Sequence, residues 1–360
     1  MLTYGDDYPI HQTPEPVAFA GSDRNFYDRY FFNGYSADGA LFFAAALGVY
    51  PHLDVIDAAF CLLVDGKQHN IRASRRLKSE RMALRVGPIE VRVIEPLKKL
   101  GVRVGDNDGG IRADLIFDAR HAPIEEPRFT RRQGPRMFMD YTRMTQNGAW
   151  SGTLTHNGVE TQIDPAQVRG TRDRSWGIRP VGAPDPQPAP GGFQFFWLWA
   201  PFNFNDRALF FHTNDDETGR AWNRRAVMDV FGASRAEYEH SVSKLVFTPF
   251  TRRIKQAEIA LAPDGPTLSI TPTGKHFYMN GLGYTHPTWG HGRDHGEFET
   301  AYDVLENADD AIPGNLHIQA LARATLADGA RKLEGVGVLE QFLIGPHAPS
   351  GFKSILDPAL

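Results

Sequence analysis

Charged and aromatic side chains gather in residues 170–180, which read Gly-Thr-Arg-Asp-Arg-Ser-Trp-Gly-Ile-Arg-Pro. Asp173 stands between Arg172 and Arg174, and Trp176 follows two residues later. Opposite charges close by favour an ionised carboxylate, so we expect Asp173 to be an anion if these two arginines lie close to it in space. Two interpretations are open. The segment is an ion-pair cluster that holds two halves of the fold together, or it is part of a site in which Asp173 orients a partner and Arg174 binds an oxyanion or a carboxylate.

A second segment, residues 281–296, holds three histidines among five glycines and a proline. His286, His291 and His295 are five and four residues apart, a spacing that does not place all three on one helix face as in a zinc-binding helical motif. We therefore expect no metal here. A histidine beside Tyr284 could transfer a proton or orient a substrate by hydrogen bonding. A purely structural loop is the other interpretation.

Large aromatic residues dominate residues 193–202, Phe-Gln-Phe-Phe-Trp-Leu-Trp-Ala-Pro-Phe. Alternate side chains of a strand share a face, which would place Phe195, Trp197 and Trp199 together. Such a row forms an apolar pocket wall whose π faces stabilise positive charge. The alternative is that both faces are ordinary core. With Trp176 and Trp289, these three aromatic residues are our expected substrate-binding set.

Strands joined by tight turns are predicted along most of the chain. Asp65-Gly66 and Asn157-Gly158 favour hairpins, because their left-handed conformations match the twist of the flanking strands. Residues 111–117 alternate apolar and polar side chains, as a strand with one buried face does. Helical patterns are few, and residues 234–242 carry the best short one because Ser234 and Glu237 have capping-box spacing.

The strand–turn–strand pattern repeats after Arg169, which indicates two similar halves. Closed or sandwiched antiparallel sheets dispose of exposed strand edges, and a barrel of about eight strands encloses one small ligand. The chain of 360 residues is long enough for two such units. We predict an all-β protein with a few short helices and two tandem antiparallel barrels or sandwiches, over residues 1–168 and 169–360.

Composition excludes several function classes. A net charge of −4 gives no reason to expect a nucleic-acid partner. No stretch approaches the ~18 apolar residues of a membrane-spanning helix, and residues 1–12 lack the pattern of a signal peptide. The lone Cys61 lies in an apolar run, which predicts an inert buried thiol and fits a reducing, cytoplasmic compartment. Phosphate-loop, dinucleotide-binding and serine-nucleophile motifs are missing, so we expect no cofactor.

Residues 172–179 resemble the Asp-His-x-Trp-Gly pattern of a family of tandem lipocalin-like proteins. The family includes the bacterial AttH proteins and the carotenoid 1,2-hydratases, also called hydroxyneurosporene synthases. The aromatic strand at residues 193–202 and the Gly-Tyr-x-His-Pro-x-Trp-Gly-His-Gly run at 283–292 add to the resemblance. It covers most of the chain at the level of strands. It implies two lipocalin-like domains with an apolar ligand between them.

In the hydratase branch, a histidine two places before the motif tryptophan and a Tyr-x-Asp on the next strand are implicated in protonating an alkene. Here Arg174 stands at the histidine's position, and the best match to Tyr-x-Asp is Trp197-x-Trp199. Arginine stays protonated, with a pKa above about 12, so it cannot act as the acid at neutral pH. Hydration of a carotenoid is therefore not expected.

We expect a cofactor-independent lyase, isomerase or cyclase that acts on a terpenoid, a steroid or a hydrophobic aromatic molecule in a cavity at the domain junction. His286 or His291 would transfer the proton, with Tyr284 assisting. A non-catalytic carrier of a lipid or isoprenoid is the alternative, and a structural partner protein is a third class. A homodimer is compatible with the sequence.

Overall fold

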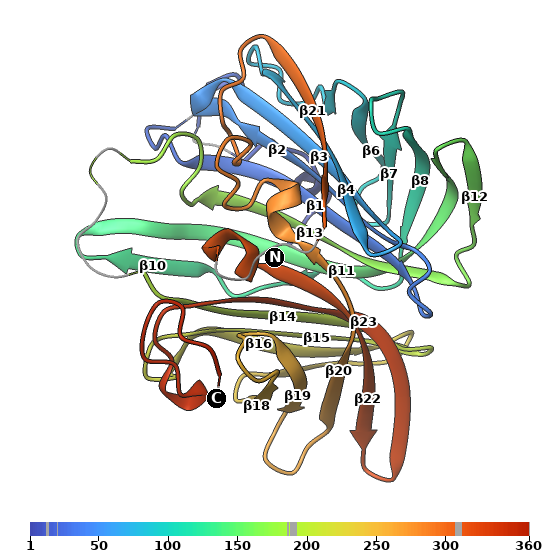
Figure 1. The fold of residues 1–360 in the computed structure, drawn as a ribbon, viewed down its shortest axis with the longest axis vertical. Coiled ribbons are helices and arrows are strands. Elements are labelled where there is room, and N and C mark those ends of the chain that lie inside the picture. Colours follow the sequence, from blue (N-terminus) through green and yellow to red (C-terminus); the bar gives the residue numbers. More distant parts are fainter. Residues whose placement is uncertain (12–13, 20, 186, 188–192, 307–311, 360) are drawn as a thin grey trace. The chain divides into compact units, whose positions relative to one another are not determined.

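The computed structural model describes residues 1–11, 14–19, 21–185, 187, 193–306 and 312–359. Within these residues, antiparallel strands form two curled sheets, and the helices are short 3-10 turns (Figure 1). The predicted all-β class is confirmed. No helix in this described part of the chain has the length and apolarity needed to cross a membrane.

The chain divides into two compact units, Met1–Pro190 with Asn280–Glu306, and Gly191–Met279 with Asn307–Leu360. This division differs from the predicted boundary between residues 168 and 169. That boundary falls at the start of β13 (Val168–Ile178), which pairs along its length with β1 (Phe26–Ser36) and β11 (Arg136–His156) of the first unit. The strand pairing therefore keeps the whole 170–178 segment in the first unit.

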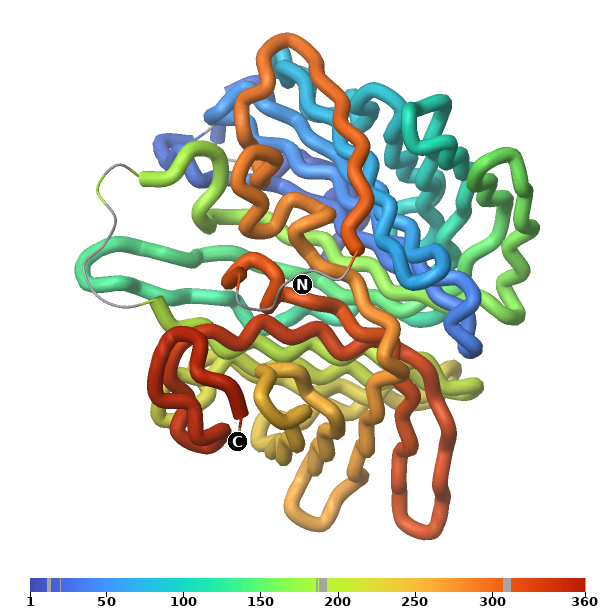
Figure 2. Tube along the Cα trace, in the orientation of Figure 1, coloured from blue at the N-terminus to red at the C-terminus, as the bar shows by residue number. Residues whose placement is uncertain are grey.

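Residues 280–306 also return to the first unit, because β21 (Phe298–Leu305) pairs with β4 (Lys67–Arg76). Figure 2 shows this orange segment running back to the blue strands of the first sheet. The histidine loop of residues 281–296 precedes β21 and is therefore part of the first unit.

The first sheet has the strand order β21-β4-β3-β2-β1-β13-β11-β8-β7-β6-β5, and β9, β10 and β12 pair with β11. Its remaining strands are β2 (Phe42–Tyr50), β3 (Val55–Val64), β5 (Arg85–Val86), β6 (Ile89–Glu95), β7 (Lys99–Val104), β8 (Ile111–Ala119), β9 (Ile124–Glu125), β10 (Phe129–Gln133) and β12 (Val159–Ile163).

The second sheet has the strand order β17-β16-β15-β14-β23-β22-β20-β19-β18. Its strands are β14 (Phe195–Asn203), β15 (Arg207–Asp215), β16 (Ala221–Val230), β17 (Arg235–Tyr238), β18 (Val242–Phe247), β19 (Ile254–Ala260), β20 (Thr267–Tyr278), β22 (Ile318–Asp328) and β23 (Arg331–Ile344). The 3-10 helices of the described residues are η1 (Tyr4–Asp7), η2 (Pro51–Leu53), η3 (Met279–Leu282), η4 (Pro313–Leu316) and η5 (Ala348–Ser350).

Each unit has its own apolar core on one face of its sheet, called here the inner face. Tyr30, Phe32 and Trp150 belong to the core of the first unit, and Phe196 and Leu198 to that of the second. Because side chains alternate along a strand, the residues between them occupy the opposite, outer face. The parity of a residue on β1, β13 or β14 thus decides which face it serves.

The helix predicted over residues 234–242 is wrong. β17 occupies Arg235–Tyr238 and pairs with β16, and Glu237 forms an ion pair with Arg225 rather than a helix cap. Pairing with the edge of the second sheet supplies the backbone hydrogen bonds that a short isolated helix would otherwise need, so tertiary context overrides the local capping signal.

Candidate active site

The pairing of β1 with β13 brings three polar or aromatic residues to one end of the inner face. Asp28 aligns with Trp176, and Tyr30 aligns with Arg174. Since Tyr30 belongs to the core, Asp28, Arg174 and Trp176 share its face. The register therefore places a carboxylate, a guanidinium and an indole side by side at the edge of an apolar core.

Asp28 and Arg174 form an ion pair in which both side chains are fully buried. The guanidinium also lies over the ring of Tyr30, 4.1 Å from its centroid. Burial disfavours the charge on Arg174, but the carboxylate of Asp28 outweighs that cost and raises the pKa above its usual range. Arg174 is therefore a permanent cation, paired with Asp28.

His11 completes this cluster from the N-terminal segment. Its Nδ1 lies 3.0 Å from Asp28 Oδ2, and its Nε2 lies 3.0 Å from Asp6 Oδ1. Its ring stacks on Trp176, with centroids 3.9 Å apart and planes 12° from parallel. Ionised carboxylate oxygens only accept hydrogen bonds, so both ring nitrogens can donate only when the imidazole is protonated. His11 therefore has a hydrogen-bond acceptor at each of its ring nitrogens.

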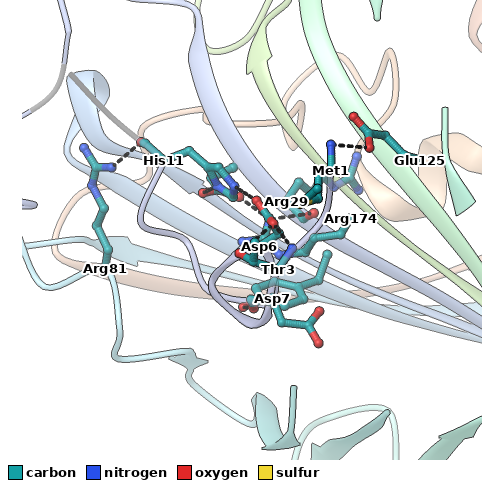
Figure 3. A network of polar contacts seen from close by, with 11 residues as sticks. Met1, Thr3, Asp6, Asp7, His11, Arg29, Arg81, Glu125 and Arg174 are labelled. Carbon is teal, nitrogen blue, oxygen red and sulfur yellow. Dashed lines mark hydrogen bonds and ion pairs between the residues drawn. The ribbon is translucent and has the colours of Figure 1, made fainter. Parts of the chain in front are cut away.

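Figure 3 shows His11, Asp6 and Arg174 in one polar network, which Arg81 reaches from another segment. Arg81 Nη1 donates to the backbone oxygen of His11 over 3.1 Å. Burial raises the pKa of Asp6, but hydrogen bonds from the backbone of Thr3 and from His11 lower it more. Asp6 is therefore held as a carboxylate beside the imidazole.

The N-terminal segment is fixed by Asp7, whose side chain is fully buried. Arg172 donates to both of its carboxylate oxygens, over 2.6 and 3.2 Å. The backbone N–H of Leu97 also donates to Asp7, and the hydroxyl of Tyr30 donates to its backbone oxygen. These bonds hold η1 against the inner face, so His11 is positioned by contacts far from it in sequence.

An open cleft of about 590 Å³ lies beside this network. Its walls include His11, Trp176, Asp6, Phe26 and Arg81. Apolar rings with a few convergent polar groups are the usual lining of a small-molecule site. The cluster therefore combines a titratable ring with access from solvent.

A second cluster, around His291, lies on the outer face of β1. Arg29, the neighbour of Asp28, places Nη1 3.2 Å from His291 Nδ1, and Arg179 places Nη2 at the same distance from that atom. The Nε2 of His291 lies 3.0 Å from the backbone oxygen of Leu282. Guanidinium groups only donate, so Nδ1 accepts and Nε2 donates its hydrogen to the carbonyl. His291 is thus held as a neutral ring.

Tyr284 packs within this outer cluster. Its ring centroid lies 4.4 Å from that of His291, and the guanidinium carbons of Arg29 and Arg179 lie 4.6 and 5.3 Å from it. Asp57 secures the next residue of the loop by accepting a hydrogen bond from Gly292 N over 2.7 Å. Burial raises the pKa of Asp57. The structure thus brings the predicted Tyr284 and His291 together, but around two arginines.

His286 and Trp289 form a separate turn in the same loop. The Nδ1 of His286 accepts hydrogen bonds from the backbone of Thr288 and of Trp289, over 3.2 and 2.8 Å. Burial, followed by the charge of Arg72, lowers the pKa of His286 to about 4. This half-buried ring is neutral at pH 7. The indole of Trp289 stacks on His295 at 3.8 Å.

Asp173 lies on the outer face, aligned with Phe31 of β1 and Thr145 of β11. The prediction of an ionised Asp173 required Arg172 and Arg174 to lie close to its side chain, but adjacent residues of a strand point to opposite faces. Those two arginines pair with Asp7 and Asp28 on the inner face.

Phe195, Trp197 and Trp199 share the outer face of β14 in the second unit, as the alternation predicted. Trp197 Nε1 donates to Glu340 Oε1 over 3.0 Å, and His317 Nε2 lies 2.7 Å from the same oxygen. The idea that residues of both halves line one shared cavity stays a prediction.

His11, Asp28 and Asp6 were missed by sequence reasoning. His11 precedes the first strand in a stretch without periodicity, and it meets Asp28 only through tertiary contacts. Asp28 had one available signal, since it is an acid on the core-facing parity of an aromatic strand. In the described part of the chain, no three His, Cys, Asp or Glu side chains are grouped so that they could hold a metal ion.

Comparison with known proteins gives a family and a fold. The model of a family of unknown function, DUF8625, matches residues 2–353. No curated protein matches the chain. Among solved structures, a protein provisionally named AttH from Nitrosomonas europaea is similar with a TM-score of 0.55 and 13% identity, over 93% of this chain and 98% of that one.

Kievitone hydratase from Nectria haematococca is similar with a TM-score of 0.50 and 11% identity, over 88% of each chain. At these identities the likeness shows the fold. It confirms the tandem lipocalin-like architecture and the predicted resemblance to AttH-like proteins.

Proposed function

Since this chain belongs to the family of unknown function DUF8625, its role must be inferred from its own site, and we propose that it is an enzyme acting on a small apolar molecule in the cleft beside His11. The proposed chemistry is proton transfer without a cofactor, as in a lyase, isomerase or cyclase. The observation that carries the proposal is the imidazole of His11, held between two carboxylates on Trp176 at the cleft wall. A hydratase with the same fold supports a proton-transfer reaction.

In this proposal His11 is the general acid, and Asp28 is the positioning residue that fixes its ring. The Nε2–H bond points to Asp6, which is partly exposed, whereas Asp28 is fully buried. An alkene carbon or an oxygen of the substrate takes the place of Asp6 and receives the proton. The neutral ring then accepts a proton from a neighbouring carbon, or from the water that attacks the cation, which restores the imidazolium.

Trp176, Phe26 and Ile10 supply the apolar walls of the cleft. The face of Trp176 stabilises positive charge, and the exclusion of water strengthens each electrostatic interaction in the site. Arg174 acts through Asp28, as a second positioning residue. Asp173, Tyr284, His286 and His291 are not among the residues that line the cleft, so the proposal gives them no part in this proton-transfer step.

The experiment that tests this function is a turnover screen followed by one substitution. Wild-type protein is incubated with kievitone and with terpenoid and steroid alkenes, and products are identified by mass spectrometry. His11→Gln should then lower turnover by about 10²–10⁴-fold, the usual contribution of one placed acid. His240→Gln, which changes an exposed histidine of the second unit, serves as the control.

Wild-type turnover by His11→Gln would overturn the role of His11. Ligands that stay bound to the wild-type protein without any change in mass would overturn the enzyme proposal and support a carrier function.

A further inference from the structure

Two buried arginines lie side by side beneath the N-terminal segment. Arg172 and Arg174 are two residues apart on β13 and point to the inner face, and their residues are 1% and 0% exposed. Burying a guanidinium is costly unless its charge and its donors are matched. The partners of these two side chains therefore indicate what the site is built to hold.

Each guanidinium nitrogen of Arg172 has a hydrogen-bond partner, whereas those of Arg174 are only partly paired. Arg172 has Asp7 on two nitrogens and the side-chain oxygen of Gln146 on Nε, 2.9 Å away. Arg174 donates from Nη1 to Asp28, whereas its buried Nε and Nη2 have no hydrogen-bond partner among the described residues. Two strong donors are thus available inside the unit, on the arginine two residues along β13 from the one that binds Asp7.

Asp7 belongs to the N-terminal segment rather than to the sheet. Its carboxylate binds Arg172 through two parallel hydrogen bonds, the arrangement that arginine offers to any carboxylate. We propose that Asp7 occupies a carboxylate subsite, and that the substrate is an apolar molecule carrying a carboxylate that binds Arg172 and Arg174 in its place. This inference rests on the proposed function for the position of the apolar part, which lies in the cleft along Phe26 and Trp176.

The exchange keeps the buried charges balanced, since one carboxylate replaces another on Arg172. The protein loses the bonds of Asp7 to Leu97 and Tyr30, and Arg174 gains partners for its free donors. His11 stays in the site through its own contacts with Asp28 and Trp176. Burial of the apolar part of the ligand then favours the bound state. A neutral ester of the same shape cannot make this exchange, because it leaves the charge of Arg172 unmatched.

The test compares 11-(dansylamino)undecanoic acid with its methyl ester by fluorescence titration. Asp7→Asn removes the competing carboxylate and nearly preserves shape, so it should bind the acid at least about tenfold more tightly than wild type does, while ester binding is unchanged. Asp264→Asn, an exposed substitution in the second unit, should bind both probes as wild type does. The double variant Asp7→Asn/Arg172→Gln should lose much of the gain.

A measurement on the wild-type protein guards against an unfolded variant. Saturating acid should increase hydrogen exchange in residues 3–8, because it displaces Asp7, whereas the ester should not. Equal binding of acid and ester by Asp7→Asn, or unchanged exchange in wild type with the acid bound, overturns the subsite. Both readouts need no turnover. A protein that turns over neutral substrates but shows no preference for the acid therefore refutes this inference and leaves the proposed function standing.

Discussion

His11 and His291 contact opposite faces of β1, and the side chains that hold their rings carry opposite charges. His11 meets the inner-face cluster through Asp28, and His291 meets the outer-face cluster through Arg29, the next residue of β1. Both rings pack against an aromatic side chain, Trp176 or Tyr284. In one cluster the ring faces two carboxylates, and in the other it faces two guanidinium groups.

The difference teaches that partners, rather than residue type, decide what a histidine can do. Carboxylates accept hydrogen bonds, so they suit a ring whose nitrogens donate. Guanidinium groups need a lone pair, which leaves a neutral ring that fixes a loop. The partners Asp28 and Arg29 are adjacent residues of β1, yet the histidine on Asp28 is a candidate acid and the one on Arg29 is a structural acceptor.

The largest effect is expected at Asp28. Asp28→Asn leaves the fully buried Arg174 without its counter-charge, so the free energy of unfolding should fall by about 3–5 kcal/mol. Urea unfolding measures this loss. The double variant Asp28→Asn/Arg174→Gln removes both charges and should recover most of it. A double variant as unstable as the single one would show that charge pairing is not what holds this cluster.

A smaller effect is expected at His291. His291→Phe removes the acceptor shared by Arg29 and Arg179, and should cost about 1–3 kcal/mol because their donors lose a buried partner. His291→Gln offers an amide oxygen and should lose less. Nitrogen NMR of the wild-type ring should find the hydrogen on Nε2. A hydrogen on Nδ1 would contradict the assignment of His291 as an acceptor.

The smallest effect concerns His286, which has backbone donors in place of either kind of charged group. Its pKa is lowered to about 4 by burial and by Arg72, from 6.5 in the unfolded chain. Below pH 6.5 the unfolded chain therefore binds the proton more readily, so stability is lost as pH falls toward 4. After allowance for solvent screening of this half-exposed group, the loss is about 1 kcal/mol.

His286→Gln removes that titration and keeps an acceptor for the loop. Between pH 7 and pH 4.5, the melting temperature should therefore fall less steeply for this variant than for wild type. The exposed variant His240→Gln serves as the control, and its pH dependence should match wild type. Parallel curves for His286→Gln and wild type would contradict the lowered pKa.

The sequence predicted the strand architecture well, because alternation and turn residues are local signals. Residues 111–117 and 195–199 form strands as their patterns indicated. The helix at 234–242 failed because pairing with β16 outweighed a local cap. The division of the chain differs from the predicted boundary at 168 because β13 pairs with β1, and β21 pairs with β4. Both pairings join distant parts of the chain, which no local pattern encodes.

The candidate site could be predicted only in part. The motif pointed to Arg174 and Trp176, which lie at the cleft cluster, and alternation alone would have separated Asp173 from both flanking arginines. His11 could not be predicted, since it is brought to Asp28 by the anchoring of Asp7 on Arg172. The histidine loop carried a correct grouping of Tyr284 with His291, but its arginine partners come from β1 and from the end of β13.

The return of β21 to the first sheet has a consequence for the nascent chain. On the ribosome, the outer edge of β4 stays unpaired until residues 298–305 have emerged, after most of the second unit has been made. An open strand edge is a template for pairing with other chains. Aggregation during synthesis should therefore depend on how quickly that late segment arrives, and a protein truncated before residue 298 exposes the edge permanently.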